Sequence, residues 1–199
     1  MRKALLLLCF LSICAFAQNT HYFLGVQNSK YAFAGIENPN RFGFSIKNSL
    51  FVEDLEYQYV RAAIFYNFQL PFNIGGRYTL YSGIRYNRDF YDFGGNLHLK
   101  WNVFDKLLQI ESSFLSYYDS DLGRKICYLV GIQTMFLKEI GVFAGFKNIP
   151  EYRDSEQRIY GGLVFEVPRI LVKPEISIPT NAKRETTRIS FSFTYRNTI

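Results

Sequence analysis

Few residues of this sequence belong to the types that carry enzymatic or metal chemistry. Beyond Cys9 and Cys14 near its start, it holds a single cysteine, Cys127, and two histidines, His21 and His98. A nucleophilic serine or cysteine needs a base beside it, and neither histidine has a serine nearby in a recognisable setting. Two histidines and one cysteine also lack the ligand spacing of a zinc site. We therefore expect no enzyme, no metal site and no cofactor.

Binding of nucleotides or nucleic acids is not indicated either. The segments FGG at 93–95 and YGG at 160–162 contain adjacent glycines, but no helix follows them to complete a phosphate-binding loop. The formal charge of +6 is not gathered into a basic cluster. The role of the charged side chains must therefore be inferred from the secondary-structure elements on which they lie.

The chain begins with the pattern of a secretory signal peptide. Arg2 and Lys3 precede an apolar run over 4–14, and the segment AFA at 15–17 has the small-x-small form of a cleavage site. A retained helical anchor is the alternative, but the run is short for a bilayer span. A lipoprotein signal at 11–14 is another alternative, with Ile13 a poor fit. We expect cleavage after residue 17.

Cleavage would leave residues 18–199 as a single exported domain. Cys127 would then be the one remaining cysteine, so no internal disulfide can hold the fold together. Loss of two basic residues leaves 21 basic against 17 acidic side chains, a formal charge of about +4. No later segment approaches the length of a transmembrane helix.

The rest of the chain has the pattern of β-strands joined by turns. Phenylalanine and tyrosine are abundant, at 20 and 15 residues, and they favour strands. Turn residues such as those at 38–40, 70–73 and 119–123 separate runs that alternate with a period of two. Twelve runs are predicted, with ten as the alternative: 20–28, 30–37, 41–51, 56–69, 74–87, 90–103, 107–118, 124–137, 139–148, 157–167, 169–178 and 185–196. Short connections require antiparallel pairing.

Alternation leaves open which face of each strand points outward, as the segment NLHLKWNV at 96–103 illustrates. The less apolar face is unusual for a soluble protein because it is rich in glycine, which holds an exposed strand poorly. It also carries bulky aromatic residues, as a filled interior requires. The glycines on this face are Gly25, Gly35, Gly43, Gly83, Gly94, Gly131, Gly141, Gly145 and Gly162, and the aromatic residues include Phe23, Phe33, Tyr81 and Phe143.

The oily face has the dimensions of a membrane-facing surface. Tyr78 and Tyr86 bracket one strand, and eight tilted residues span roughly 20 Å of height, close to the apolar band of a membrane barrel. We therefore expect Leu97, Leu99, Trp101 and Val103 to face lipid, with Trp101 near an interface. The even-numbered connections are all short and the two longest are odd-numbered, which is the asymmetry of such barrels.

The last strand strengthens this interpretation. Residues 188–195, RISFSFTY, resemble the C-terminal insertion signal of Gram-negative outer-membrane barrels. Arg188 takes the polar position, and Phe193 and Tyr195 take the two aromatic positions, with Phe191 on the same face. A serine stands where glycine is usual, and the chain continues to Ile199 instead of stopping at an aromatic residue. The resemblance implies a closed, antiparallel, up-and-down transmembrane β-barrel in the outer membrane, inserted by the barrel-assembly machinery.

The predicted interior is biased toward basic residues by about two to one. It would form either a narrow pore that favours small anionic solutes or an ion-pair network that plugs the barrel. The candidate lumen-lining residues are Lys47, Arg61, Arg85, Asp92, His98, Lys100, Glu111, Lys147, Arg158, Glu166, Lys173, Glu175 and Arg188. A plugged barrel would serve as a structural or interaction protein, with the loop at 149–156 as its contact surface. A secreted β-sandwich or lipocalin-like binding protein is the second alternative.

Overall fold

The computed structural model describes residues 20–38, 41–50, 59–85, 89–104, 107–148, 157–180 and 187–198. The predicted signal peptide and the loop at 149–156 lie outside these ranges. Among the described residues, no helix has the length and apolar character needed to cross a membrane.

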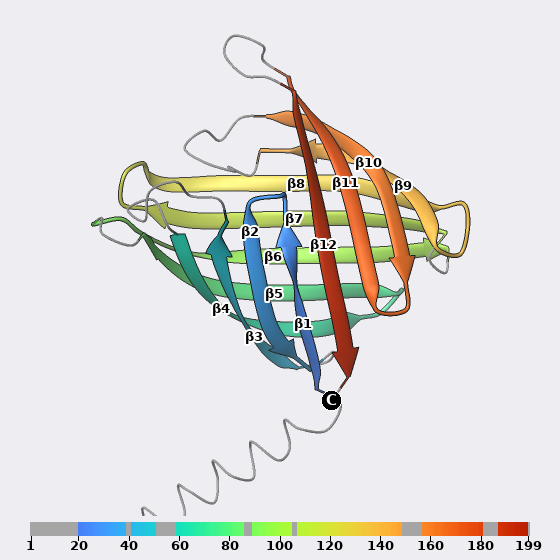
Figure 1. The fold of residues 1–199 in the computed structure, drawn as a ribbon, viewed down its shortest axis with the longest axis horizontal. Coiled ribbons are helices and arrows are strands. Elements are labelled where there is room, and N and C mark those ends of the chain that lie inside the picture. Colours follow the sequence, from blue (N-terminus) through green and yellow to red (C-terminus); the bar gives the residue numbers. More distant parts are fainter. Residues whose placement is uncertain are drawn as a thin grey trace, which may run out of the picture.

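Twelve antiparallel strands close into one barrel, so the prediction of twelve rather than ten is confirmed (Figure 1). Each strand pairs with its neighbours in sequence, and β1 pairs with β12 to complete the ring. A sandwich of two sheets does not fit this topology. The strands are β1 His21–Gln27, β2 Tyr31–Glu37, β3 Phe42–Ser49, β4 Tyr59–Leu70, β5 Ile74–Arg85, β6 Tyr91–Phe104, β7 Leu108–Asp119, β8 Gly123–Met135, β9 Ile140–Lys147, β10 Arg158–Val167, β11 Ile170–Pro179 and β12 Arg188–Thr198.

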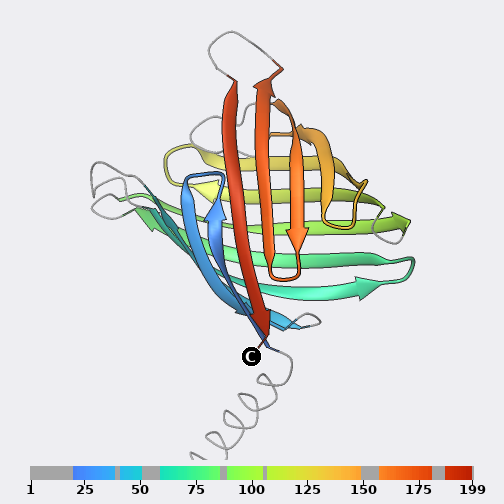
Figure 2. The same cartoon turned by 45° about the vertical axis from the view of Figure 1, so that its right-hand side comes forward.

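The strands tilt, and those of the near wall cross those of the far wall (Figures 1 and 2). The start of β1 and the end of β12 lie together at one end, where His21 pairs with Thr198. Short connections join the strands at this end, whereas the opposite end carries the long ones after Ser49, Lys147 and Pro179. Because short turns face the periplasm in such barrels, the end with the termini is the periplasmic end.

The outer surface of the barrel is apolar. Large hydrophobic side chains on the outward face are substantially exposed, including Phe93 at 53%, Trp101 at 42% and Leu97 at 37%. Phe65, Tyr81 and Phe143 have the opposite parity and are less than 10% exposed. The oily face of the strands therefore points outward, as predicted, and the side chains of Tyr81 and its neighbours fill the interior.

The interior is crowded because aromatic rings lie over inward glycines. A methyl group added to Gly83 would collide with the Tyr59 hydroxyl, and one added to Gly145 would meet the Tyr160 hydroxyl at 2.6 Å. Gly35 makes room for Phe23 on the adjacent strand in the same way. Glycine thus allows large rings to fit on the concave side of a tightly curved sheet.

Adjacent glycines on β10 provide a matched test of this packing. A Cβ at inward-facing Gly162 would collide with the Pro174 carbonyl and lie 3.0 Å from the Phe143 ring, whereas one at outward-facing Gly161 meets nothing closer than 3.2 Å. We expect Gly162→Ala to lower the free energy of unfolding by roughly 1–3 kcal/mol. Gly161→Ala should change it by less than about 1 kcal/mol. Urea unfolding in detergent micelles measures both, and equal midpoints would contradict the packing argument.

Candidate functional site

The predicted lumen-lining residues share one side of the sheet. In the strand register Lys47 stands opposite Arg61, Lys100 opposite Glu111, and Arg158 opposite Lys147. Directly opposed residues project to the same face of a sheet, and here it is the face that holds the buried aromatic residues. The register therefore brings these side chains to the inner face, but their part in passing a solute stays a prediction.

One polar cluster lies near the end with the long loops, on β4 and β6. The Arg61 guanidinium forms an ion pair with Asp92, with 2.8 Å between Nη2 and Oδ2. The Tyr59 hydroxyl donates to the same carboxylate at 2.8 Å. The Arg61 guanidinium also lies 3.8 Å from the centre of the Tyr81 ring. Asp92 is only 5% exposed, so its charge is compensated by a full set of partners.

A second cluster lies near the end with the termini. Glu37 is 4% exposed and forms ion pairs with both Arg77 and Arg196, the latter at 3.1 Å. Arg77 also donates from Nε to the Asn67 side-chain oxygen at 2.7 Å. These residues come from β2, β4, β5 and β12. The cluster thus ties both sides of the closing seam to one buried carboxylate.

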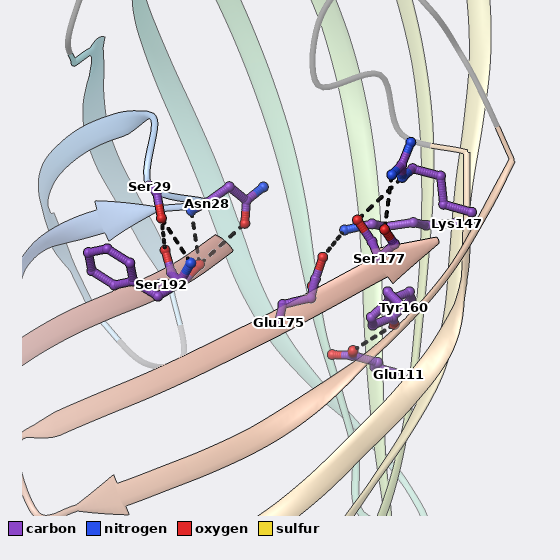
Figure 3. Close-up of polar contacts among 10 residues, drawn as sticks. Asn28, Ser29, Glu111, Lys147, Tyr160, Glu175, Ser177 and Ser192 are labelled. Carbon is purple, nitrogen blue, oxygen red and sulfur yellow. Dashed lines mark hydrogen bonds and ion pairs between the residues drawn. The ribbon is translucent and has the colours of Figure 1, made fainter. Parts of the chain in front are cut away.

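A third group of contacts joins β7, β9, β10 and β11 (Figure 3). Lys147 forms an ion pair with Glu175 at 2.5 Å between Nζ and Oε1. Arg158 donates to the Ser177 carbonyl at 3.0 Å, and the Tyr160 hydroxyl donates to Glu111 at 3.2 Å. Four more of the predicted lumen-lining residues, Lys147, Glu175, Arg158 and Glu111, therefore have partners on the wall.

Two lysines in the half of the barrel nearer the chain termini form no such ion pairs among the described residues. Lys100 lies near the end of β6, and Lys173 near the start of β11, almost opposite it in the ring. In the parts of the chain that the structure describes, no carboxylate lies within 4.0 Å of either amine. Glu111, which stands opposite Lys100 in the register, and Glu166 near the end of β10 lie in the same half of the lumen.

The remaining predicted residues are spread around the inner face. His98 stands opposite Arg77 and Ser113 in the register, and Arg188 stands opposite Ser177. The Lys47 amine lies 4.9 Å from the centre of the Tyr31 ring, and the Arg85 guanidinium 4.2 Å from that of Phe90. Glu166 is exposed. The structure brings no two of these residues into one compact site.

On β12, the insertion-signal residues divide between the two faces. Arg188 is on the inner face, and Phe191, Phe193 and Tyr195 are on the outer face, where the Tyr195 ring lies 6.2 Å from that of Tyr22. This arrangement agrees with the alternation in the sequence. Recognition of these residues by the barrel-assembly machinery stays a prediction.

Comparison with solved structures identifies the architecture. The chain is similar to the KdgM porin in complex with disordered oligogalacturonate, with a TM-score of 0.62, 14% identity, and coverage of 89% of this chain and 98% of that one. It is similar to the NanC porin with a TM-score of 0.57, 11% identity, and coverage of 90% and 99%. The fold is that of an outer-membrane porin. No family model and no curated protein matches the sequence.

A closed barrel of this fold with an apolar outer surface is an integral protein of the bacterial outer membrane. At 11–14% identity the two porins support the fold of this chain and carry no solute to it. The location also explains why charged and polar side chains are gathered on the inner face, since the outer face contacts hydrocarbon.

Several side chains that complete the polar clusters were not predicted from the sequence. Tyr59, Asn67, Tyr160 and Ser177 bind charged groups on other strands, and the period-two pattern already puts them on the inner face. The partners of Asn67 and Ser177 lie on the adjacent strand and depend on the register, and those of Tyr59 and Tyr160 lie two or three strands away, so the sequence did not indicate them. Alternation along the predicted strand 139–148 would put Glu139 on the inner face, but Glu139 lies in the exposed turn after β8.

Removal of the charge on Glu37 tests the second cluster. Glu37→Gln leaves Arg77 and Arg196 with no carboxylate between them, so we expect the free energy of unfolding to fall by roughly 1–3 kcal/mol. Glu166→Gln removes the same charge from an exposed side chain and should have a smaller effect, within about 0.5 kcal/mol. Urea unfolding followed by gel mobility measures both, and equal destabilisation would contradict a special role for Glu37.

Proposed function

We propose that this protein is a narrow pore that favours small anionic solutes. The observation that carries the proposal is the pair of lysines, Lys100 and Lys173, on nearly opposite walls. In the described parts of the chain, no carboxylate lies at ion-pair distance from either amine. A fixed positive potential at one level of a pore lowers the energy of an anion there and raises that of a cation.

The ion pairs of the other clusters support this assignment. Asp92, Glu37 and Glu175 each bind basic residues and so contribute no net negative field that would attract cations. Lys100 and Lys173 form no ion pair among the described residues. Together with Arg77 and Arg196 they outnumber the carboxylates of Glu37, Glu111 and Glu166 in this half of the lumen, within walls of low dielectric constant. Such walls concentrate the field of a charge in the lumen. Permeation rather than catalysis is the activity that this arrangement supports, with His98 as a lining residue.

The solutes that fit are small organic anions that carry carboxylate groups. A carboxylate binds well to a lysine amine, and two lysines on opposite walls would allow it to pass from one to the other. The similarity to a porin studied with oligogalacturonate, a polyanion, agrees with this class. Outer-membrane lipid surrounds the barrel, and the barrel-assembly machinery is the partner during insertion.

A plugged barrel without transport is the second candidate. The observation that favours it is the crowded interior, where Tyr81, Tyr117, Phe143 and Tyr160 are less than 10% exposed. In that case the inner charges would serve only to stabilise the wall. The two candidates differ in conductance, which separates them directly.

Planar-bilayer recording tests the pore. We expect small conductance steps whose reversal potential in a salt gradient indicates preference for chloride over potassium. The double variant Lys100→Gln and Lys173→Gln should reduce the permeability ratio by roughly two- to fivefold, because two positive charges of the lumen are lost.

The matched control is Lys138→Gln, which removes the same charge from an exposed turn after β8. It should leave the permeability ratio unchanged. A folded protein that gives no conductance steps would favour the plugged barrel, and an unchanged ratio in the double variant would contradict the role of the two lysines.

A further inference from the structure

Arg124 stands apart from every other charged side chain of the barrel wall. It lies on β8, is exposed, and belongs to the outward face, where it is the sole charged residue among the twelve strands as described. Within the described ranges, no carboxylate lies within 4.0 Å of its guanidinium. A charge on a lipid-facing surface is stable only near the interface and with a polar partner.

A groove of about 690 Å³ runs beside Arg124 on the same outer surface. Its floor lies where Gly95 and Ser116 stand directly opposite each other on β6 and β7. Two small residues in register leave a depression in a wall that otherwise carries large side chains. Leu80 and Tyr78 form one side, and a Cβ on Gly95 would lie only 3.1 Å from the Tyr78 hydroxyl.

The groove follows the strands from the apolar band to the rim. Leu97 and Phe114 line the end of the groove nearer the middle of the membrane. Phe93 and Tyr118 line the end beside Arg124, and the centres of these two rings lie 5.4 Å apart. Phe93 and Leu97 are four positions apart, which corresponds to about 13 Å along the strand. The apolar lining and length suit part of an acyl chain, and Arg124 at the rim suits an anionic head group.

We propose that this groove binds a phosphorylated, multiply acylated glycolipid of the outer leaflet, with an acyl chain over Gly95 and Ser116 and a phosphate on Arg124. Arg124 lies next to the β7–β8 connection, at the end of the barrel opposite the termini. This is the extracellular end, so the head groups that it meets are those of the outer leaflet. Guanidinium binds phosphate in a bidentate manner, and its own charge is then compensated.

This site is separate from the lumen and does not depend on the pore. An acyl chain in bulk lipid would contact any part of the wall equally, whereas a chain in the groove also contacts Tyr78, Phe93 and Phe114. The combination of a shaped apolar groove with one uncompensated arginine at its rim therefore predicts a preference for one class of lipid over the general membrane lipid.

Native mass spectrometry of the purified barrel in detergent tests the proposal. The probes are hexa-acylated lipid A with two phosphates, the same lipid without phosphates, and phosphatidylglycerol. The wild-type barrel should retain phosphorylated lipid A, and retain the phosphate-free lipid at least about fivefold less at equal concentration, because that lipid offers no anion to Arg124. Phosphatidylglycerol should also be retained less, because its phosphodiester carries less negative charge than the phosphomonoesters of lipid A. Arg124→Gln and Ser116→Leu should each lower retention of phosphorylated lipid A by a similar factor.

Two control variants match the charge and the volume change. Lys125→Gln removes a charge from the neighbouring, inward-facing residue, and Ser112→Leu adds the same bulk on the outer face of β7 outside the groove. Both should retain lipid A as the wild type does, and Arg124→Lys should retain most of it. Variants are compared only after heat-dependent gel mobility shows a folded barrel.

Equal retention of phosphatidylglycerol would overturn the proposal, because it would indicate general anionic lipid around the wall. Retention by Arg124→Gln and Ser116→Leu at the wild-type level, or no retention by the wild type, would overturn it as well. Conductance of the Arg124→Gln barrel should equal that of the wild type, so failure of this proposal is distinguishable from failure of the pore.

Discussion

The constraint on which this structure depends is that backbone groups in hydrocarbon must find hydrogen-bond partners within the protein. Twelve strands satisfy it by pairing in a ring, and the pairing of β1 with β12 is the one that removes the last two edges. Where β1 ends, the turn continues the ladder: Ser29 donates its backbone N–H to the Phe191 carbonyl at 2.8 Å, and its side chain accepts from the Phe191 N–H at 2.9 Å (Figure 3). Hydrogen bonds between β1 and β12 thus continue past Val26 and Phe193, the last regular pair of the two strands.

Closure determines what the interior can contain. A ring of twelve tilted strands is narrow, so large inward side chains fit only where the facing wall recedes, and the inward glycines provide that space. Tyr160 illustrates the consequence, because its hydroxyl lies over Gly131 and Gly145 and donates to Glu111 on the far side of that space. Packing and hydrogen bonding are therefore coupled, because the same ring that fills the barrel also brings a hydroxyl to a partly buried carboxylate.

The sequence was sufficient for the fold because alternation, turn residues and chain closure are local or general features. The predicted strand 20–28 is observed as His21–Gln27, and 169–178 as Ile170–Pro179. The partners inside the lumen were not predictable, since Glu37 binds Arg77 across three strands and Arg196 across the seam, and such distances depend on the tilt and the rotamers of long side chains. The groove was missed for a related reason. It arises from Gly95 lying opposite Ser116, which only the register between β6 and β7 reveals.

The charges of the barrel fall into two kinds, which have different physical roles. Arg61, Arg77 and Lys147 bind carboxylates on other strands, so their removal would leave buried charge uncompensated, and they stabilise the wall. Lys100, Lys173 and Arg124 have no such partner among the described residues, and desolvation makes their positions costly rather than stabilising. Each of them faces a phase in which a mobile anion is available, either the water of the lumen or the head groups of the outer leaflet. Their partners are therefore expected to come from outside the chain, which is the property that a transport path and a lipid site have in common.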